Sequence, residues 1–183
     1  MNKIFFNHKI VNAWSEKERE EFRTKSNLPI LKSRNDFINR LRDERVVIVI
    51  AETGSGKTTQ LPQYMTDAFK IEEGIIVVTQ PRALAAISIA ERVGFEYDGP
   101  EIGKAGYSVG FKVGKDSTQS RTNRIVFMTD AQLIKEMMND NFLSKVRGLL
   151  IDEAHERSVN TDIVLGKIIL KKYSNFVSPN FYF

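Results

Sequence analysis

The chain has 183 residues and a formal net charge of +4; 42% of its residues are hydrophobic and 27% are charged. This length suffices for one domain with a buried core, and the composition is ordinary for a globular protein. No apolar run approaches the roughly 20 residues of a membrane-spanning helix, and the first residues lack the apolar stretch of a signal peptide. Because cysteine is absent, disulfides and thiolate metal sites are excluded. The mild positive charge is permissive for a polyanionic partner.

The first 45 residues are polar and charge-rich, and we interpret them as an N-terminal helical extension. Ser15 precedes a charged stretch with Glu18 three residues further on, which is the spacing of a capping box at a helix start. Leu28-Pro29-Ile30 interrupts this helix. Residues 33–45 carry apolar side chains at helical spacing and predict a second helix.

From residue 46 onward, short apolar runs alternate with helical patterns. The first run, residues 46–50, is entirely β-branched, which is typical of a strand buried on both faces. Further strands are expected at residues 75–78, 125–128 and 149–151, and helices at about residues 57–69, 82–93, 130–139 and 162–171. This alternation predicts an α/β fold, a mainly parallel sheet with helices on both faces, over residues 46–172.

Three segments fit this alternation less well. Residues 103–114 alternate apolar and polar side chains and are interpreted as an additional strand. The polar residues 114–123 are interpreted as a loop. Residues 173–183 match no element, and we expect an irregular C-terminal tail there, since chain ends are often poorly ordered.

A phosphate-binding loop is predicted between the first strand and the helix that follows it. Two glycines let the backbone bend so that successive amides point inward, and the helix N-terminus adds a partial positive charge. Lys57 is expected to reach the β- and γ-phosphates, and Thr58 to ligate Mg²⁺ through its hydroxyl. The candidate nucleotide-binding residues are Glu52, Thr53, Gly54, Ser55, Gly56, Lys57, Thr58 and Thr59. The alternative interpretation is a glycine-rich turn without a binding role that precedes a lysine by chance.

Two adjacent carboxylates end the apolar run at residues 149–151. Acidic residues at the end of a buried strand lie at the edge of the sheet. There we expect Asp152 to hold Mg²⁺ and Glu153 to orient or deprotonate a water. Glu153 is counted with Thr58 and Asp152 as a candidate metal ligand. A solvated acidic pair is the structural alternative. With the phosphate loop, the pair predicts hydrolysis of a nucleoside triphosphate.

His155 is a candidate catalytic residue that links the nucleotide to a neighbouring domain, although a lone histidine is as often structural.

Several segments, in order, resemble the first RecA-like domain of DEAH-box ATP-dependent RNA helicases. The matching motifs are ETGSGKTTQLPQ at Glu52–Gln63, TQPRALAA at Thr79–Ala86, GYSVGFK at Gly106–Lys112, TDAQLIKE at Thr129–Glu136 and DEAHERSVNTDIVLG at Asp152–Gly166. The resemblance covers roughly residues 28–172. It implies a RecA-like P-loop NTPase fold, ATP and Mg²⁺ as cofactors, single-stranded RNA bound without sequence preference, and an intracellular location, nuclear or cytoplasmic.

The resemblance also assigns individual residues. It implies that Arg92 stacks on the nucleotide base, and that Arg82 and Thr129 contact the RNA backbone, which positions a strand without reading its sequence. Four positions depart from the family pattern: Ala51, Gly110 and Ala131, together with Ala83 in place of a second arginine. An alanine at position 51 fits if φ is negative. The candidate ATP site therefore matches the family pattern at more positions than the candidate RNA site does.

The family's Ser-Ala-Thr motif and its second RecA-like domain, which supplies arginine fingers, are not found in the sequence. We therefore expect the chain alone to bind ATP–Mg²⁺ weakly, to hydrolyse it slowly, and to act with a protein partner or the missing domain. The leading interpretation is the ATPase domain of a DEAH-box helicase, either a fragment or a truncated paralogue. The alternatives are a non-catalytic nucleotide-binding module that acts through a partner, and a different phosphate-loop enzyme such as a nucleotide kinase or a DNA translocase.

Overall fold

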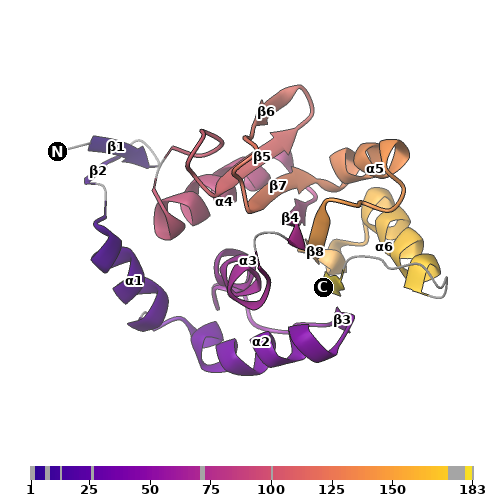
Figure 1. Ribbon diagram of the computed structural model, residues 1–183, viewed down its shortest axis with the longest axis horizontal. Coiled ribbons are helices and arrows are strands. Elements are labelled where there is room, and N and C mark those ends of the chain that lie inside the picture. The colour runs from indigo at the N-terminus through magenta and orange to yellow at the C-terminus, as the bar shows by residue number, and fades with distance from the viewer. Residues whose placement is uncertain are drawn as a thin grey trace.

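The computed structural model describes residues 3–6, 9–12, 14–25, 27–70, 73–99, 101–172 and 180–182 (Figure 1). Its main feature is a twisted sheet with helices on both faces. Within the described residues this sheet has seven strands in the order β3-β9-β8-β4-β7-β5-β6. All neighbouring pairs are parallel except β5 and β6. The α/β fold class expected from the alternating pattern is confirmed.

Strands and helices of the main body lie close to their expected positions. The strands are β3 (Val46–Val47), β4 (Ile75–Gln80), β5 (Val109–Val113), β6 (Asp116–Thr118), β7 (Ile125–Thr129), β8 (Val146–Ile151) and β9 (Asn180–Tyr182). The helices are α3 (Lys57–Ala68), α4 (Ala83–Tyr97), α5 (Asp130–Asn139), α6 (Val159–Lys172) and the short η3 (Ala154–Glu156). The segment expected to be a polar loop contains β6, which pairs with β5 as a hairpin.

The two faces of the sheet have separate cores. Apolar side chains of α2 (Arg34–Asp43), α3 and α4 pack on one face, around Val78 and Phe127. Those of α5 and α6 pack on the other face, around Val77 and Leu149. Because neighbouring residues of β4 point to opposite faces, the continuous apolar run of this strand supplies both cores.

The N-terminal segment is only partly helical. The capping box forms at the start of α1 (Glu16–Lys25): the Ser15 amide donates to the Glu18 carboxylate at 2.7 Å, and the Glu18 amide donates to the Ser15 hydroxyl at 3.2 Å. After α1, the 3-10 helix η1 (Pro29–Ser33) leads into α2. The expected helical extension also contains a β-hairpin, β1 (Lys3–Phe6) with β2 (Lys9–Asn12).

The expected strand at residues 46–50 is shorter than predicted. The ladder ends at Val47, because β9 pairs only with Val46 and Val47. Beyond it Ile48 is 71% exposed and Ile50 is 93% exposed, so burial on both faces was a wrong expectation for these residues. The partner strand lies in the segment expected to be irregular: Asn180–Tyr182 forms β9, which is inserted between β3 and β8. Residues 173–179 and 183 lie outside the described residues.

No helix in the described parts of the chain is both long enough and apolar enough to cross a membrane.

Candidate nucleotide-binding site

Four of the five sequence motifs converge at one edge of the sheet, where the parallel strands end, and the fifth, Gly106–Lys112, leads into β5. β4, β7 and β8 are neighbours, with Gln80 opposite Thr129 and Thr79 opposite Ile151. The acidic pair follows β8, and Arg82 follows β4 as the N-cap residue of α4. Ligands of open α/β sheets bind at this carboxyl edge. The motifs are therefore brought to the position that the fold uses for small-molecule sites.

The loop before α3 has the backbone that a phosphate cradle requires. Gly54 and Gly56 have φ values of +79° and +95°, which other residue types rarely adopt. Gly56 is the N-cap of α3, and a Cβ there would lie 3.1 Å from the Leu28 side chain and 3.2 Å from that of Ile30. Ala51 is not among the positive-φ residues, so it meets the condition set for an alanine at this position.

The Lys57 side chain folds back over its own loop. Its ammonium donates to the carbonyl oxygens of Ala51 at 2.5 Å and of Glu52 at 3.0 Å. A bound phosphate would compete with these carbonyls for the same charge. The Ser55 hydroxyl is buried and has no hydrogen-bond partner among the described residues, and the Thr59 hydroxyl donates to the Gly56 carbonyl at 3.3 Å.

A hydrogen bond joins the phosphate loop to the acidic pair. The Thr58 hydroxyl donates to Asp152 Oδ2 at 2.5 Å, although the two residues are 94 positions apart. The Gln80 side-chain amide donates to the same oxygen at 2.5 Å, and the Glu153 amide donates to Oδ1 at 2.9 Å. Gln80 was missed by the sequence reasoning, although its position at the end of a buried strand was a usable signal. A hydroxyl and a carboxylate oxygen are suitable ligands for Mg²⁺, so this pair fits the metal that the motifs imply.

Glu153 lies in a strained part of the backbone. Its φ of +54° and ψ of +30° are left-handed, which costs a non-glycine residue about 1–2 kcal/mol. The conformation turns the chain sharply out of β8 into η3, so that Asp152 and Glu153 do not continue the strand. His155 Nε2 lies 3.4 Å from Glu153 Oε2, and the His155 side chain is 79% exposed. The histidine therefore lies at the rim of the site.

A cavity of about 720 Å³ connects these groups. The phosphate loop and the segment from Asp152 to His155 line it, together with residues 48–51. Arg92 lines it from α4, and its stacking on a nucleotide base stays a prediction. Phe22 of α1 and Leu28 also line it, and neither was predicted from the sequence.

Arg92 is held by a buried polar network. Its Nε donates to Glu96 Oε1, one turn further along α4. The other carboxylate oxygen of Glu96 accepts from the side-chain amides of Gln60 at 2.8 Å and Gln63 at 3.1 Å, both on α3. The Glu96 side chain is only 1% exposed, and these donors compensate the cost of burying its charge. The network links Arg92 to the helix that begins at the phosphate loop.

The two predicted RNA-contact residues also have structural contacts. Arg82 forms an ion pair of 3.3 Å with Glu156, which follows the acidic pair. Thr129 is the N-cap of α5, where its hydroxyl accepts from the Gln132 amide at 3.2 Å. Gly110 has no room for a longer side chain: a Cβ there would lie 2.5 Å from Asn123 Oδ1 and 2.7 Å from the Thr118 carbonyl. The family's arginine at this position is therefore incompatible with the local packing of this chain.

A parallel α/β sheet with a phosphate loop and an acidic strand end at its carboxyl edge defines the RecA-like class of P-loop domain. Residues 32–176 match the family model described as DEAD/DEAH box helicase. The chain belongs to this family.

Several relatives are more than 40% identical to the chain. The human protein named "Probable ATP-dependent RNA helicase DHX40" is 44% identical over 161 residues, which cover 88% of this chain and 20% of that protein. Human "ATP-dependent RNA helicase DHX33" is 44% identical over 77% of this chain and 19% of its own length. "Probable ATP-dependent RNA helicase DHR1" of Saccharomyces cerevisiae is 42% identical over 77% of this chain and 11% of its own length. The chain thus spans a fifth or less of these relatives.

Proposed function

We propose that this chain is the ATP-binding and ATP-hydrolysing domain of a DEAH-box RNA helicase. The observation that carries the proposal is the hydrogen bond between Thr58 and Asp152, because it places the phosphate loop directly against the acidic pair. Family membership and the names of the relatives support the same function. The cavity beside this hydrogen bond is large enough for a nucleoside triphosphate.

Each residue of the proposed site has a separate role in phosphoryl transfer. The inward-pointing amides of the phosphate loop and the Lys57 ammonium hold the triphosphate, once Lys57 exchanges its loop carbonyls for phosphate oxygens. Thr58 and Asp152 would hold Mg²⁺, which neutralises phosphate charge when bound. Glu153 accepts a proton from the attacking water and orients it toward the γ-phosphate. His155, at the rim and beside Glu153, passes the state of the nucleotide to a neighbouring domain.

RNA is the proposed partner at the exposed surface of the same carboxyl edge of the sheet. The Arg82 side chain is 76% exposed. Arg82 follows β4 and Thr129 ends β7, so both lie at the carboxyl edge of the sheet. Contacts from such residues to phosphate oxygens would hold a single strand independently of its sequence. The ion pair between Arg82 and Glu156 connects this surface to the segment that follows Asp152 and Glu153.

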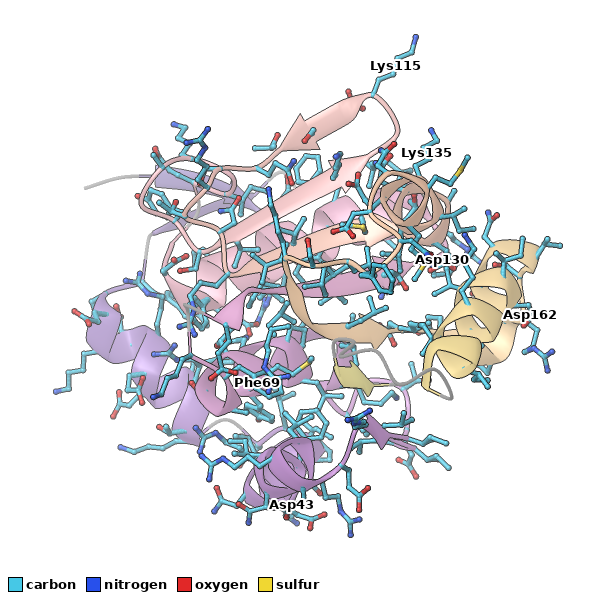
Figure 2. All side chains as sticks on the ribbon, turned by 45° about the vertical axis from the view of Figure 1, so that its right-hand side comes forward. Asp43, Phe69, Lys115, Asp130, Lys135 and Asp162 are labelled. Carbon is cyan, nitrogen blue, oxygen red and sulfur yellow. The ribbon has the colours of Figure 1, made fainter. Side chains whose placement is uncertain are left out.

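The proposal is tested by Mg²⁺-dependent binding of ATP and by ATPase activity with and without RNA. We expect Lys57→Ala to weaken ATP binding about 10- to 100-fold, because charge-assisted hydrogen bonds are worth about 1.5–3 kcal/mol. Lys115→Ala is the matched control, since Lys115 lies at the exposed tip of the β5–β6 hairpin, away from the cavity (Figure 2).

Glu153→Gln separates binding from chemistry. We expect it to keep ATP affinity and to abolish turnover, because the amide cannot accept the proton of water. A chain that binds ATP but shows no turnover, with or without RNA, is instead a nucleotide-binding module without catalysis. A chain that does not bind Mg²⁺–ATP at all contradicts the proposal.

A further inference from the structure

One buried carboxylate at the carboxyl edge of the sheet has no part in the proposed chemistry. Asp130 is the first residue of α5, directly after Thr129, and it is 1% exposed. Its Oδ2 accepts from the Thr161 hydroxyl at 2.6 Å, whereas its Oδ1 is buried without a hydrogen-bond partner among the described residues. The N-terminus of a helix favours a negative charge, but a buried carboxylate with an unpaired oxygen is costly. A neutral residue would begin this helix at a lower cost, so the carboxylate points to a role beyond packing.

Hydrogen bonds lead from Asp130 to the residue that precedes α6. Thr161 is in the first turn of α6 and is 1% exposed. Because its hydroxyl has one proton, which it donates to Asp130, the Ser158 hydroxyl is the donor in the 2.7 Å contact between Ser158 and Thr161. The Thr161 amide donates in return to Ser158 Oγ at 3.0 Å. We call this chain of Ser158, Thr161 and Asp130 the buried link; Figure 2 shows Asp130 where α5 and α6 meet.

The buried link ends on a segment whose backbone is strained at two places. Residues 153–158, here called the acidic segment, contain Glu153 and Arg157 with φ values of +54° and +50°. Strained residues of this kind persist only where the surrounding structure holds them. Glu153 and His155 line the cavity that contains the phosphate loop. The position of the cavity wall therefore depends on what supports the acidic segment.

Two surface ion pairs support the acidic segment as well. Arg157 pairs with Asp162 at 2.7 Å, and Arg82 pairs with Glu156 at 3.3 Å. The members of both pairs are exposed to solvent, and exposed ion pairs contribute little to stability. The buried link instead includes a charge-assisted hydrogen bond that is shielded from water, which is stronger. We therefore regard it as the main support of the segment.

We propose that Asp130 is a positioning residue that connects the proposed RNA contact at Thr129 with the nucleotide site. It holds the acidic segment through the buried link, so that RNA and nucleotide each change the affinity for the other. This inference rests on the proposed function. The Thr129 hydroxyl accepts from the Gln132 amide and can still donate its proton to an RNA phosphate. Since Thr129 and Asp130 are consecutive, such a contact acts on the start of α5, and through the buried link on Glu153.

The test measures a coupling factor, the ratio of the affinities for single-stranded RNA with and without a non-hydrolysable ATP analogue and Mg²⁺. Fluorescence anisotropy of a labelled oligouridine gives both affinities. We expect a factor that differs from one by about 5-fold or more in the unaltered chain, the usual range for coupled sites. Thr161→Val keeps the shape of the side chain but removes the hydroxyl, and should bring the factor close to one while the affinity for each ligand alone changes little. Thr161→Ser keeps the hydroxyl and should retain the factor.

Ser158→Ala breaks the buried link at its other end and leaves the hydrogen bond between Thr161 and Asp130 in place. It should also bring the coupling factor close to one. If Asp130 acts through the link, Asp130→Ala should have little further effect on the factor in this background. Thr66→Val is the matched control: its hydroxyl on α3 is buried and donates to the Gln63 carbonyl at 2.7 Å, but it does not line the cavity. The control should lower the melting temperature and keep the factor.

The inference is overturned if the unaltered chain has a coupling factor of one, or if Thr161→Val and Ser158→Ala fold and retain the factor. Loss of the factor in Thr66→Val as well would also overturn it, because any buried hydroxyl would then have the same effect. These outcomes leave the proposed function intact. Failure of the unaltered chain to bind the nucleotide or RNA would instead contradict the proposed function and this inference together.

Discussion

The proposed phosphate end of the site and the proposed RNA side lie at the same sheet edge but are built differently. At the phosphate end, Thr58, Gln80 and Asp152 are joined by hydrogen bonds between separate motifs, and each side chain is at least partly buried. On the proposed RNA side, Arg82 is exposed and has one long ion pair, and Thr129 uses its hydroxyl to cap a helix. The proposed phosphate end is thus held by partly buried contacts within the domain, whereas Arg82 on the proposed RNA side is exposed.

Among these substitutions, we expect that of Asp152 to have the largest effect on nucleotide binding. We expect Asp152→Asn to weaken Mg²⁺–ATP binding about 10- to 100-fold. This is the usual effect, about 10- to 100-fold, of mutating a residue that hydrogen-bonds to the ligands of a metal ion. Affinity for ATP without Mg²⁺ should change little, because Lys57 and the loop amides remain. Calorimetry with and without a chelator measures both values. Asp43→Asn is the control, since Asp43 ends α2 on the exposed surface (Figure 2).

Gly56→Ala tests whether the backbone of the phosphate loop is fixed before nucleotide binds. At a φ of +95°, with Leu28 and Ile30 within 3.2 Å of the added Cβ, we expect the free energy of unfolding to fall by about 1–2 kcal/mol. Urea denaturation measures it.

Gly166→Ala provides a control of opposite sign. Gly166 is inside α6, has no positive φ, and a Cβ there meets nothing within 4 Å. It should stabilise the protein by about 0.5–1 kcal/mol. Equal destabilisation by both substitutions would mean that the phosphate loop imposes no special backbone requirement.

Arg82→Ala should have the smallest effect on stability, and it tests the proposed contact of Arg82 with RNA. An exposed ion pair contributes about 0–1 kcal/mol, so the melting temperature should change little. Affinity for single-stranded RNA should fall for all sequences alike, and the slope of log affinity against log salt should decrease by about one. Fluorescence anisotropy over a salt series measures this. An unchanged slope would remove Arg82 from the proposed RNA surface.

The parts of the fold that depend on local patterns could be predicted from the sequence. The β-branched and apolar runs gave β4, β7 and β8, and the spacing of Ser15 and Glu18 gave the start of α1. The phosphate loop and the acidic pair were predicted to act together in hydrolysis of a nucleoside triphosphate, and the hydrogen bond between Thr58 and Asp152 brings them into contact. These inferences needed only residue types and periods of a few residues.

The parts that depend on long-range pairing were missed. The length of β3 is set by β9, whose sequence indicates no strand, and the contact of Phe22 with Arg92 depends on how α1 packs against α4. The capping-box spacing predicted the helix α1 but not which of its residues faces the cavity. Glu96 belongs to none of the motifs found in the sequence, and Gln60 lies in the first motif without an assigned role. Their hydrogen bond appears only when α3 and α4 are placed together.

The pairing of Val46 with Phe181 has a consequence for how this domain folds. β3 is the strand before the phosphate loop, separated from it by residues 48–51, and its ladder in the described sheet is made only with β9. Contacts of high sequence separation carry a large loop-closure entropy and form slowly. We therefore expect the nucleotide site to be completed late in folding, after β4, β7 and β8 have paired, and to depend on residues 180–182 having been synthesised.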